Sequence, residues 1–184
     1  ELPSAHDASD PATACIMARV ISNDISKLNV NAWCNWVAVN EIGVGDDGKD
    51  YSDGLLVADP NNTADYYTAY RLYGYMQFSK FVPAGSQVLD CGDGMLTLTS
   101  SKTDEGTTYR ELVNETAFKT PDGKIVVVVV NEGNSRNVKF SLDDYSNVSV
   151  YTTYSELKCS NTYSGALKDK YEITANSINT FVFE

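Results

Sequence analysis

The chain has 184 residues, of which 14 are basic and 25 acidic, so its net charge is −11. This charge argues against a nucleic-acid partner and against anionic membrane surfaces, since both require a basic face, whereas it suits a soluble protein that handles a neutral substrate. An apolar share of 42% is too high for disorder, and the longest apolar run, Ile125–Val130, is too short to span a membrane.

The first predicted element is an amphipathic helix over Ser9–Leu28. Its apolar residues recur at spacings of three and four, as expected of a helix with one buried face. These residues are Ala14, Met17, Ile21, Ile25 and Leu28. Asp7, Ser9 or Asp10 is expected to cap the start, and Pro11 suits the first turn.

The next residues predict a strand and a second helix. Ala32–Val39 is apolar on both alternating faces, which is typical of a strand covered on both sides, as in a parallel barrel. A polar loop follows over Asn40–Asn62, and then a helix is predicted over Thr63–Phe81, closed by Pro83 and Gly85. This order of helix, buried strand, loop and helix is typical of βα units.

From Gln87 onward short β-prone runs alternate with turn signals. The predicted strands are Gln87–Leu89, Met95–Ser100, Glu111–Lys119, Ile125–Asn131, Val138–Leu142, Val148–Tyr154, Tyr171–Ile173 and Ser177–Phe183. Pro121–Lys124 reads Pro-Asp-Gly-Lys, a hairpin signal, because Pro sets φ and Gly supplies a positive φ. This spacing predicts a β-sandwich over residues 86–184, after a helical part over residues 1–85, and an α+β fold overall.

Four segments in this order resemble the family 30 glycoside hydrolases. Asn31–Trp36 (NAWCNW) is similar to the eighth barrel strand of that family, and Ser52–Leu56 (SDGLL) to the segment after it. Leu72–Gly85 (LYGYMQFSKFVPAG) is similar to the final barrel helix and its ending. Ala117–Asn131 (AFKTPDGKIVVVVVN) is similar to the sandwich hairpin, with Ser177–Phe181 (SINTF) near the end.

The resemblance implies that residues 1–85 are the last βα units of a (β/α)8 TIM barrel and that residues 86–184 are its side β-sandwich. It further implies a secreted, retaining endo-β-glycanase that hydrolyses xylan or a β-1,6-linked galactan or glucan. Such enzymes use two carboxylates about 5–5.5 Å apart, one a nucleophile and one a general acid/base. Under this resemblance the acid/base residue lies on a barrel strand outside this chain.

The resemblance makes Glu1 the candidate nucleophile, because it precedes the helix that should follow strand seven. The alternative is that Glu1 is a terminal residue of no catalytic significance. In the first case the partner is the N-terminal part of the same enzyme, as a separate or missing segment. The 184-residue chain by itself is then expected to be inactive.

Substrate-binding candidates surround the expected end of the strand. Trp36 lies nearer the C-terminal rim, where an indole can stack on a sugar ring, and Trp33 is expected to pack in the core. Asn35, Asn40 and Glu41 are candidates for hydrogen bonds to sugar hydroxyls, although solvated loop polarity is the favoured explanation for any single one of them. The alternative function is a non-catalytic carbohydrate-binding or adhesive sandwich.

The cysteines give no metal signal. Cys15, Cys34, Cys91 and Cys159 are widely spaced without a CxxC pair, and His6 is the sole histidine. A zinc site is therefore not expected, and neither a metal nor a cofactor is predicted. Spacing leaves open whether these cysteines are free or joined in disulfides.

Overall fold

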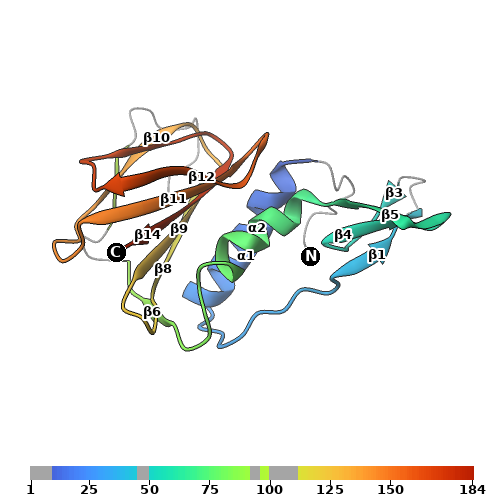
Figure 1. The fold of residues 1–184 in the computed structure, drawn as a ribbon, viewed down its shortest axis with the longest axis horizontal. Coiled ribbons are helices and arrows are strands. Elements are labelled where there is room, and N and C mark those ends of the chain that lie inside the picture. The colour runs from blue at the N-terminus through green and yellow to red at the C-terminus, as the bar shows by residue number, and fades with distance from the viewer. Residues whose placement is uncertain (1–9, 45–49, 92–95, 100–111) are drawn as a thin grey trace.

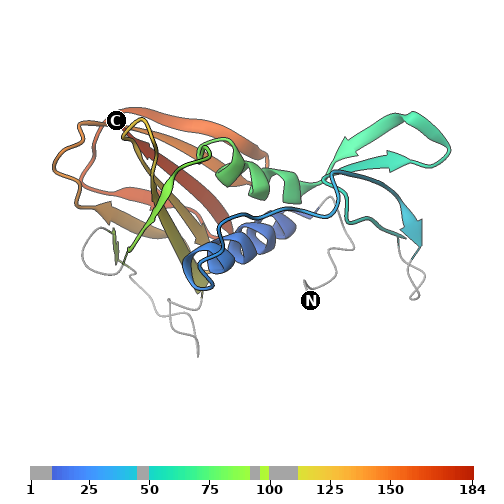
Figure 2. The ribbon, with the colours of Figure 1, turned by 90° about the horizontal axis from the view of Figure 1, so that it is seen from below.

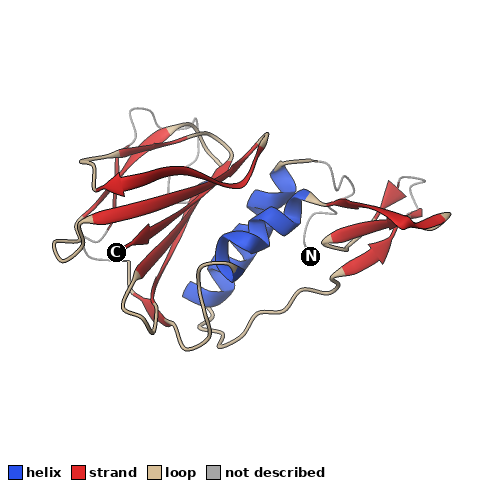
Figure 3. Ribbon diagram, viewed as in Figure 1, coloured by secondary structure: helices blue, strands red, loops and turns tan. Residues whose placement is uncertain are grey.

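The computed structural model describes residues 10–44, 50–91, 96–99 and 112–184. The described part contains a β-sandwich, two helices that cover one face of its larger sheet, and a small sheet beyond the helices (Figure 1). The view from below shows the helices between the sandwich and the small sheet (Figure 2). Strands dominate the molecule (Figure 3), so the mixed α and β composition expected from the sequence is present.

The larger sheet has six strands, each antiparallel to its neighbours. In spatial order they are β12 (Leu157–Ala166), β11 (Asn147–Tyr154), β14 (Ser177–Phe183), β9 (Ile125–Asn131), β8 (Val113–Lys119) and β6 (Gln87–Leu89). The predicted hairpin joins β8 to β9: Gly123 has a φ of 89°, and its N–H donates to the Thr120 carbonyl at 2.9 Å.

A smaller antiparallel sheet covers one face of the larger one. Its strands, in spatial order, are β13 (Tyr171–Ile173), β10 (Arg136–Phe140) and β7 (Leu96–Thr99). Val138 and Ile173 from this sheet lie in one buried cluster with Val127 and Phe181 from the larger sheet. The two sheets therefore share a core, as expected of a sandwich.

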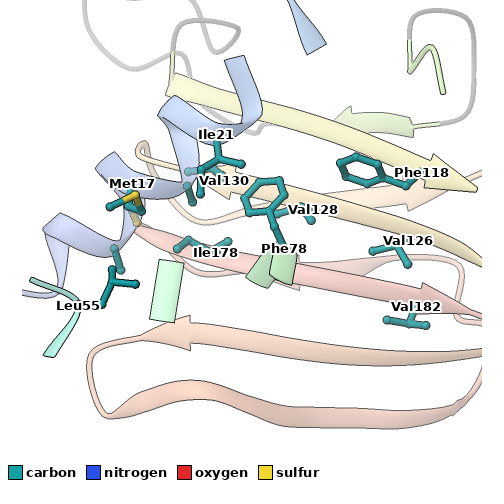
Figure 4. Close-up of a cluster of buried hydrophobic side chains, with 13 residues drawn as sticks. Met17, Ile21, Leu55, Phe78, Phe118, Val126, Val128, Val130, Ile178 and Val182 are labelled. Atoms are coloured by element: carbon teal, nitrogen blue, oxygen red, sulfur yellow. The ribbon is translucent and has the colours of Figure 1, made fainter. Parts of the chain in front are cut away.

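Strand β9 is buried on both faces, as its continuous apolar run indicates. Val127 and Val129 belong to the cluster between the two sheets, whereas Val126, Val128 and Val130 belong to the cluster beneath the helices (Figure 4). These five side chains are at most 1% exposed. Full burial of one such side chain stabilises the folded state by roughly 1.5–3 kcal/mol. Strand β9 contributes side chains to both clusters, so it lies at the centre of the hydrophobic core.

Helix α1 spans Ala12–Ser26, a shorter range than the predicted Ser9–Leu28. Asp10 caps its start, since its Oδ1 accepts the N–H of the first helical residue at 2.9 Å. Leu28 lies beyond the helix and is 70% exposed, so the predicted apolar face was one turn too long. The chain leaves the helical conformation at Asn29, whose φ is 55°.

The predicted helix over Thr63–Phe81 is wrong in its first part. Residues Asn62–Thr68 form strand β5, and helix α2 spans Tyr70–Ser79. Strand β5 pairs antiparallel with β4 (Leu56–Asp59). Thr and Tyr are β-prone residues, and pairing with β4 satisfies their backbone groups, which the local pattern could not reveal.

The predicted buried strand over Ala32–Val39 is also wrong. Residues 32–38 are irregular, none of residues 32–39 is buried, and strand β1 spans Val39–Glu41. Strand β1 pairs in parallel with β4, and β5 lies on the other side of β4, so β1 has a neighbour on one edge in the described structure. A strand buried on both faces needs neighbours and cover that residues 32–38 lack here.

The helices pack on the sandwich and on each other. Ile21 of α1 and Phe78 of α2 lie in one apolar cluster with Val128 and Ile178 of the larger sheet (Figure 4).

The division at residue 85 into a barrel end and a sandwich stays a prediction. A further short pair, β2 (Gly43–Val44) with β3 (Asp50–Tyr51), completes the described strands. Neither described helix has the length and apolarity that crossing a membrane requires.

Candidate functional site

The predicted site residues other than Glu1 lie on one stretch of chain. Glu1 falls outside the described residues, whereas Asn35, Trp36, Asn40 and Glu41 lie in or just before β1. Backbone hydrogen bonds from Leu55 to Val37 (3.1 Å) and from Leu56 to Ala38 (2.9 Å) extend the pairing of this stretch with the β4 side. The site therefore begins where this stretch meets the loop before β4.

The two tryptophans of this stretch have different surroundings. Trp36 is 83% exposed, so most of its side chain is open to solvent. Trp33 is partly buried against the helix-side core: its Nε1 donates to Oδ2 of Asp24 at 2.8 Å, and its ring lies 5.9 Å from that of Tyr75. Trp33 packs as the sequence predicted, and Trp36 is free to stack on a ligand.

Among the polar candidates, Asn40 has the most defined surroundings. Its Nδ2 donates to Oδ1 of Asp53 at 2.5 Å, and its Oδ1 accepts the backbone N–H of Glu41 at 3.0 Å. Asn35 donates from Nδ2 to the carbonyl of Val37 at 3.1 Å, a local turn contact. The Glu41 side chain is exposed. Asn40 is thus joined to a separate loop, whereas Asn35 contacts its own segment.

That loop, Ser52–Gly54, packs closely against Asn40. Ser52 is buried, and its hydroxyl donates to the carbonyl of Asn40 at 3.5 Å while accepting the N–H of Gly54 at 3.3 Å. A Cβ added at Gly54 would lie 2.6 Å from the backbone nitrogen of Asn40 and 2.4 Å from the carbonyl oxygen of Leu56. Glycine is therefore required at this position because two backbones approach each other closely.

Arg71, at the start of α2, completes the cluster, and sequence reasoning missed it. It is buried, and its Nη2 donates to the carbonyl of Ser52. Burial lowers the pKa of Arg71, and the nearby Asp53 carboxylate partly offsets this effect. The sequence predicts a helix over Thr63–Phe81 with Arg71 near its middle. An arginine in the middle of a helix is usually solvated, so no sequence signal identifies Arg71 as a buried residue.

The cluster offers the amide of Asn40 and the carboxylate of Asp53, which hydrogen-bond each other, and the exposed Trp36 precedes Asn40 by four residues. Such groups hydrogen-bond hydroxyls and stack on apolar ring faces, which is the chemistry of recognition for a neutral polar ligand. Among the described residues, no group of three or more His, Cys, Asp or Glu side chains is placed to hold a metal ion.

A separate groove of about 670 Å³ lies at the C-terminal ends of the two helices. Trp33, Tyr75 and Phe118 are among its lining residues, and neither Trp36 nor Asn40 lines it. The groove is therefore distinct from the cluster around Asn40.

Residues 98–181 match the family model "Glycosyl hydrolase family 30 beta sandwich domain". The match covers most of the strands of both sheets of the sandwich. No curated protein matches the chain.

Solved structures of similar fold cover almost the whole chain. The catalytic domain of GH30 xylanase C from Talaromyces cellulolyticus aligns with 93% of this chain at 22% identity and a TM-score of 0.65, using 35% of its own length. A conserved exported protein from Bacteroides fragilis aligns with 92% at 19% identity and a TM-score of 0.69, using 33% of its length. A GH30 endoxylanase from Clostridium papyrosolvens C71 aligns with 96% at 22% identity and a TM-score of 0.60, using 39% of its length.

The likeness to these structures extends beyond the sandwich to the helices and the small sheet, because it covers more than nine tenths of the chain. The chain spans between a third and two fifths of the length of each of them.

Proposed function

Because residues 98–181 carry a glycosyl hydrolase family 30 β-sandwich, we propose that this chain is the carboxy-terminal part of a secreted retaining endo-β-glycanase. In this proposal residues 1–85 are the last βα units of a (β/α)8 barrel and residues 86–184 are its side sandwich. The polypeptide that supplies the rest of the barrel is the partner of the chain.

One observation carries the proposal: a single fold likeness covers the sandwich and the segment before it, and two of the similar structures are named as GH30 xylanases. A non-catalytic sandwich module would not require the helices and the stretch with Trp36.

The proposed reaction is a double displacement by two carboxylates. Glu1 is the proposed nucleophile: its ionised carboxylate attacks the anomeric carbon, the leaving oxygen takes a proton from the acid/base residue, and water then releases the sugar. The acid/base residue belongs to the part of the barrel outside this chain. Trp36 stacks on a sugar ring, and Asn35, Asn40 and Glu41 hydrogen-bond its hydroxyls.

The proposed substrate is a neutral polysaccharide of the xylan or β-1,6-linked galactan or glucan type. The net charge of −11 disfavours a polyanionic glycan, because like charges repel. Xylan is the first candidate to test, since two of the similar structures are named as xylanases.

The full-length enzyme should hydrolyse one member of a panel of xylan, β-1,6-glucan and β-1,6-galactan, and the 184-residue chain alone should not. A mechanism-based fluoro-sugar should label Glu1, and Glu1→Gln should lose nearly all of kcat because the covalent intermediate cannot form. Mass spectrometry of the labelled peptide gives the position.

Glu41→Gln is the matched control, since Glu41 is the last residue of β1 and has no proposed covalent role; it should keep the label on Glu1. Label on another carboxylate would remove the nucleophile assignment alone. Glycan binding without hydrolysis by the full-length protein would instead favour a carbohydrate-binding module.

A further inference from the structure

A buried arginine lies beneath the loop that contacts Asn40. Arg71 is 6% exposed, and its Nη2 donates to the backbone carbonyl of Ser52. Its Nε has no hydrogen-bond partner among the described residues. Burying a guanidinium costs free energy unless other groups compensate its charge, so the residues around Arg71 must stabilise it.

Asp53 supplies this compensation. Its negative charge favours the protonated form of Arg71, against the effect of burial, which lowers the pKa of Arg71. The same carboxylate accepts the hydrogen bond from Nδ2 of Asn40 at 2.5 Å. Ser52 connects the buried arginine to Asn40, because its backbone carbonyl accepts from Arg71 and its hydroxyl donates to the carbonyl of Asn40. The adjacent Asp53 accepts from the Asn40 side chain, so the loop meets Asn40 at two neighbouring residues.

These contacts fix the orientation of the Asn40 carboxamide. Its Nδ2 donates to Asp53 and its Oδ1 accepts from the N–H of Glu41, so a flipped amide would place like groups against each other. A carboxamide has two N–H donors and two acceptor lone pairs, and these contacts use one of each. One donor and one acceptor remain for a ligand, which matches the needs of a hydroxyl group.

We propose that Arg71 is a positioning residue, which holds the Ser52–Gly54 loop and, through Asp53, sets the Asn40 carboxamide for a hydroxyl of a bound sugar. The loop approaches Asn40 closely at Gly54, where an added Cβ would lie 2.6 Å from the Asn40 backbone nitrogen, so displacing the loop should displace the amide with it. The inference rests on the proposed glycan-binding function, because it assigns the ligand of Asn40.

The first test uses the 184-residue chain and needs no substrate. The side-chain amide signals of Asn40, identified by their loss in Asn40→Asp, should be well separated by NMR. Arg71→Met should bring the two amide-proton shifts toward those of a free asparagine, whereas Lys80→Met, at the exposed end of the same helix, should leave them unchanged. Arg71→Gln removes the charge but keeps a polar side chain, and it provides the second variant if Arg71→Met fails to fold.

The second test is a double-mutant cycle in the full-length enzyme. Arg71→Met should lower kcat/KM about tenfold, mainly through KM, as expected for losing one well-placed hydrogen bond to the substrate. In an Asn40→Ala background the same substitution should lower it by less than about twofold, because its effect acts through Asn40. A structural role alone predicts equal losses in both backgrounds and would overturn the inference.

The two tests separate this inference from the proposed function. Unchanged Asn40 signals in a folded Arg71→Met or Arg71→Gln chain refute positioning, whatever the enzyme hydrolyses. Altered signals, combined with a wild-type enzyme that hydrolyses no glycan of the panel, leave the link between Arg71 and Asn40 intact and refute the proposed function.

Discussion

Two tryptophans three positions apart show how surroundings decide the role of a residue. Trp33 is partly buried and donates to Asp24, whereas Trp36 is 83% exposed. Their spacing would place them on opposite faces of a strand, but residues 32–38 are irregular, and the spacing does not say which side chain is covered. In this structure α1 and α2 cover the face of Trp33, so packing stabilises Trp33 and leaves Trp36 available for a ligand.

Trp36→Ala should change the free energy of unfolding of the 184-residue chain by less than about 0.5 kcal/mol, because the side chain buries little surface. In the full-length enzyme it should weaken glycan binding by about 1–3 kcal/mol through the lost stacking. Denaturant unfolding and steady-state kinetics measure the two effects.

Trp33→Ala is the matched comparison. Aromatic-to-alanine changes in a core cost roughly 3–5 kcal/mol, and Trp33→Ala should cost less than this because Trp33 is partly buried. If Trp36→Ala left both kcat and KM unchanged, the proposed sugar contact would be wrong.

At the scale of elements, α1 and α2 depend on close contacts with each other and with the sheet. A Cβ added at Gly74 of α2 would lie 2.2 Å from the carbonyl oxygen of Ala14 in α1. Gln77, which is fully buried, donates to the Thr153 hydroxyl at 2.8 Å and accepts from the Thr180 hydroxyl at 2.6 Å. Helix α2 is thus pinned to α1 by the small size of glycine and to the sheet by a satisfied buried amide.

Gly74→Ala should destabilise the fold by about 1–3 kcal/mol, because the added methyl group meets backbone and forces the helices apart. This loss exceeds the gain of about 1 kcal/mol that alanine brings to a helix interior. Thermal unfolding followed by circular dichroism measures the change. Ser79→Ala, at the exposed end of the same helix, is the control and should change little; a stabilised Gly74→Ala protein would contradict the close crossing of α1 and α2.

At the scale of the whole molecule, burial separates four free cysteines into classes. Cys15 and Cys159 are buried, Cys91 is half-buried and Cys34 is exposed. Burial raises the pKa of the Cys15 thiol to about 12 and that of Cys91 to about 11. Burial also raises the pKa of Cys159, so these three thiols stay protonated at neutral pH.

Iodoacetamide at pH 8 should therefore label Cys34 first in the folded chain, and Cys15 and Cys159 should react after unfolding. Peptide mass spectrometry over a time course measures the order, and labelling in denaturant without reductant should modify all four cysteines. Rapid labelling of Cys15 in the folded chain, or fewer than four reactive thiols in denaturant, would contradict this packing.

Elements whose residue pattern reflects their own burial could be predicted from the sequence. Ile125–Asn131 is a strand with the predicted bounds, because a β-branched run buried on both faces has one stable place, the centre of a covered sheet. Strands β6, β13 and β14 also have the predicted bounds, and the first helix is present in shortened form.

The remaining elements depend on contacts between segments far apart in sequence, which the local pattern does not report. The polar edge strand β12 (Leu157–Ala166) was missed, since its place depends on pairing with β11 and not on an apolar pattern. Residues 32–38 carry a strand pattern but are irregular, and the strand begins only at Val39, where pairing with β4 starts. Residues 62–68 pair with β4 instead of extending a helix. Arg71 could not be assigned for the same reason: it donates to Ser52 in the loop that contacts Asn40, and periodicity does not indicate which segments far apart in sequence will meet.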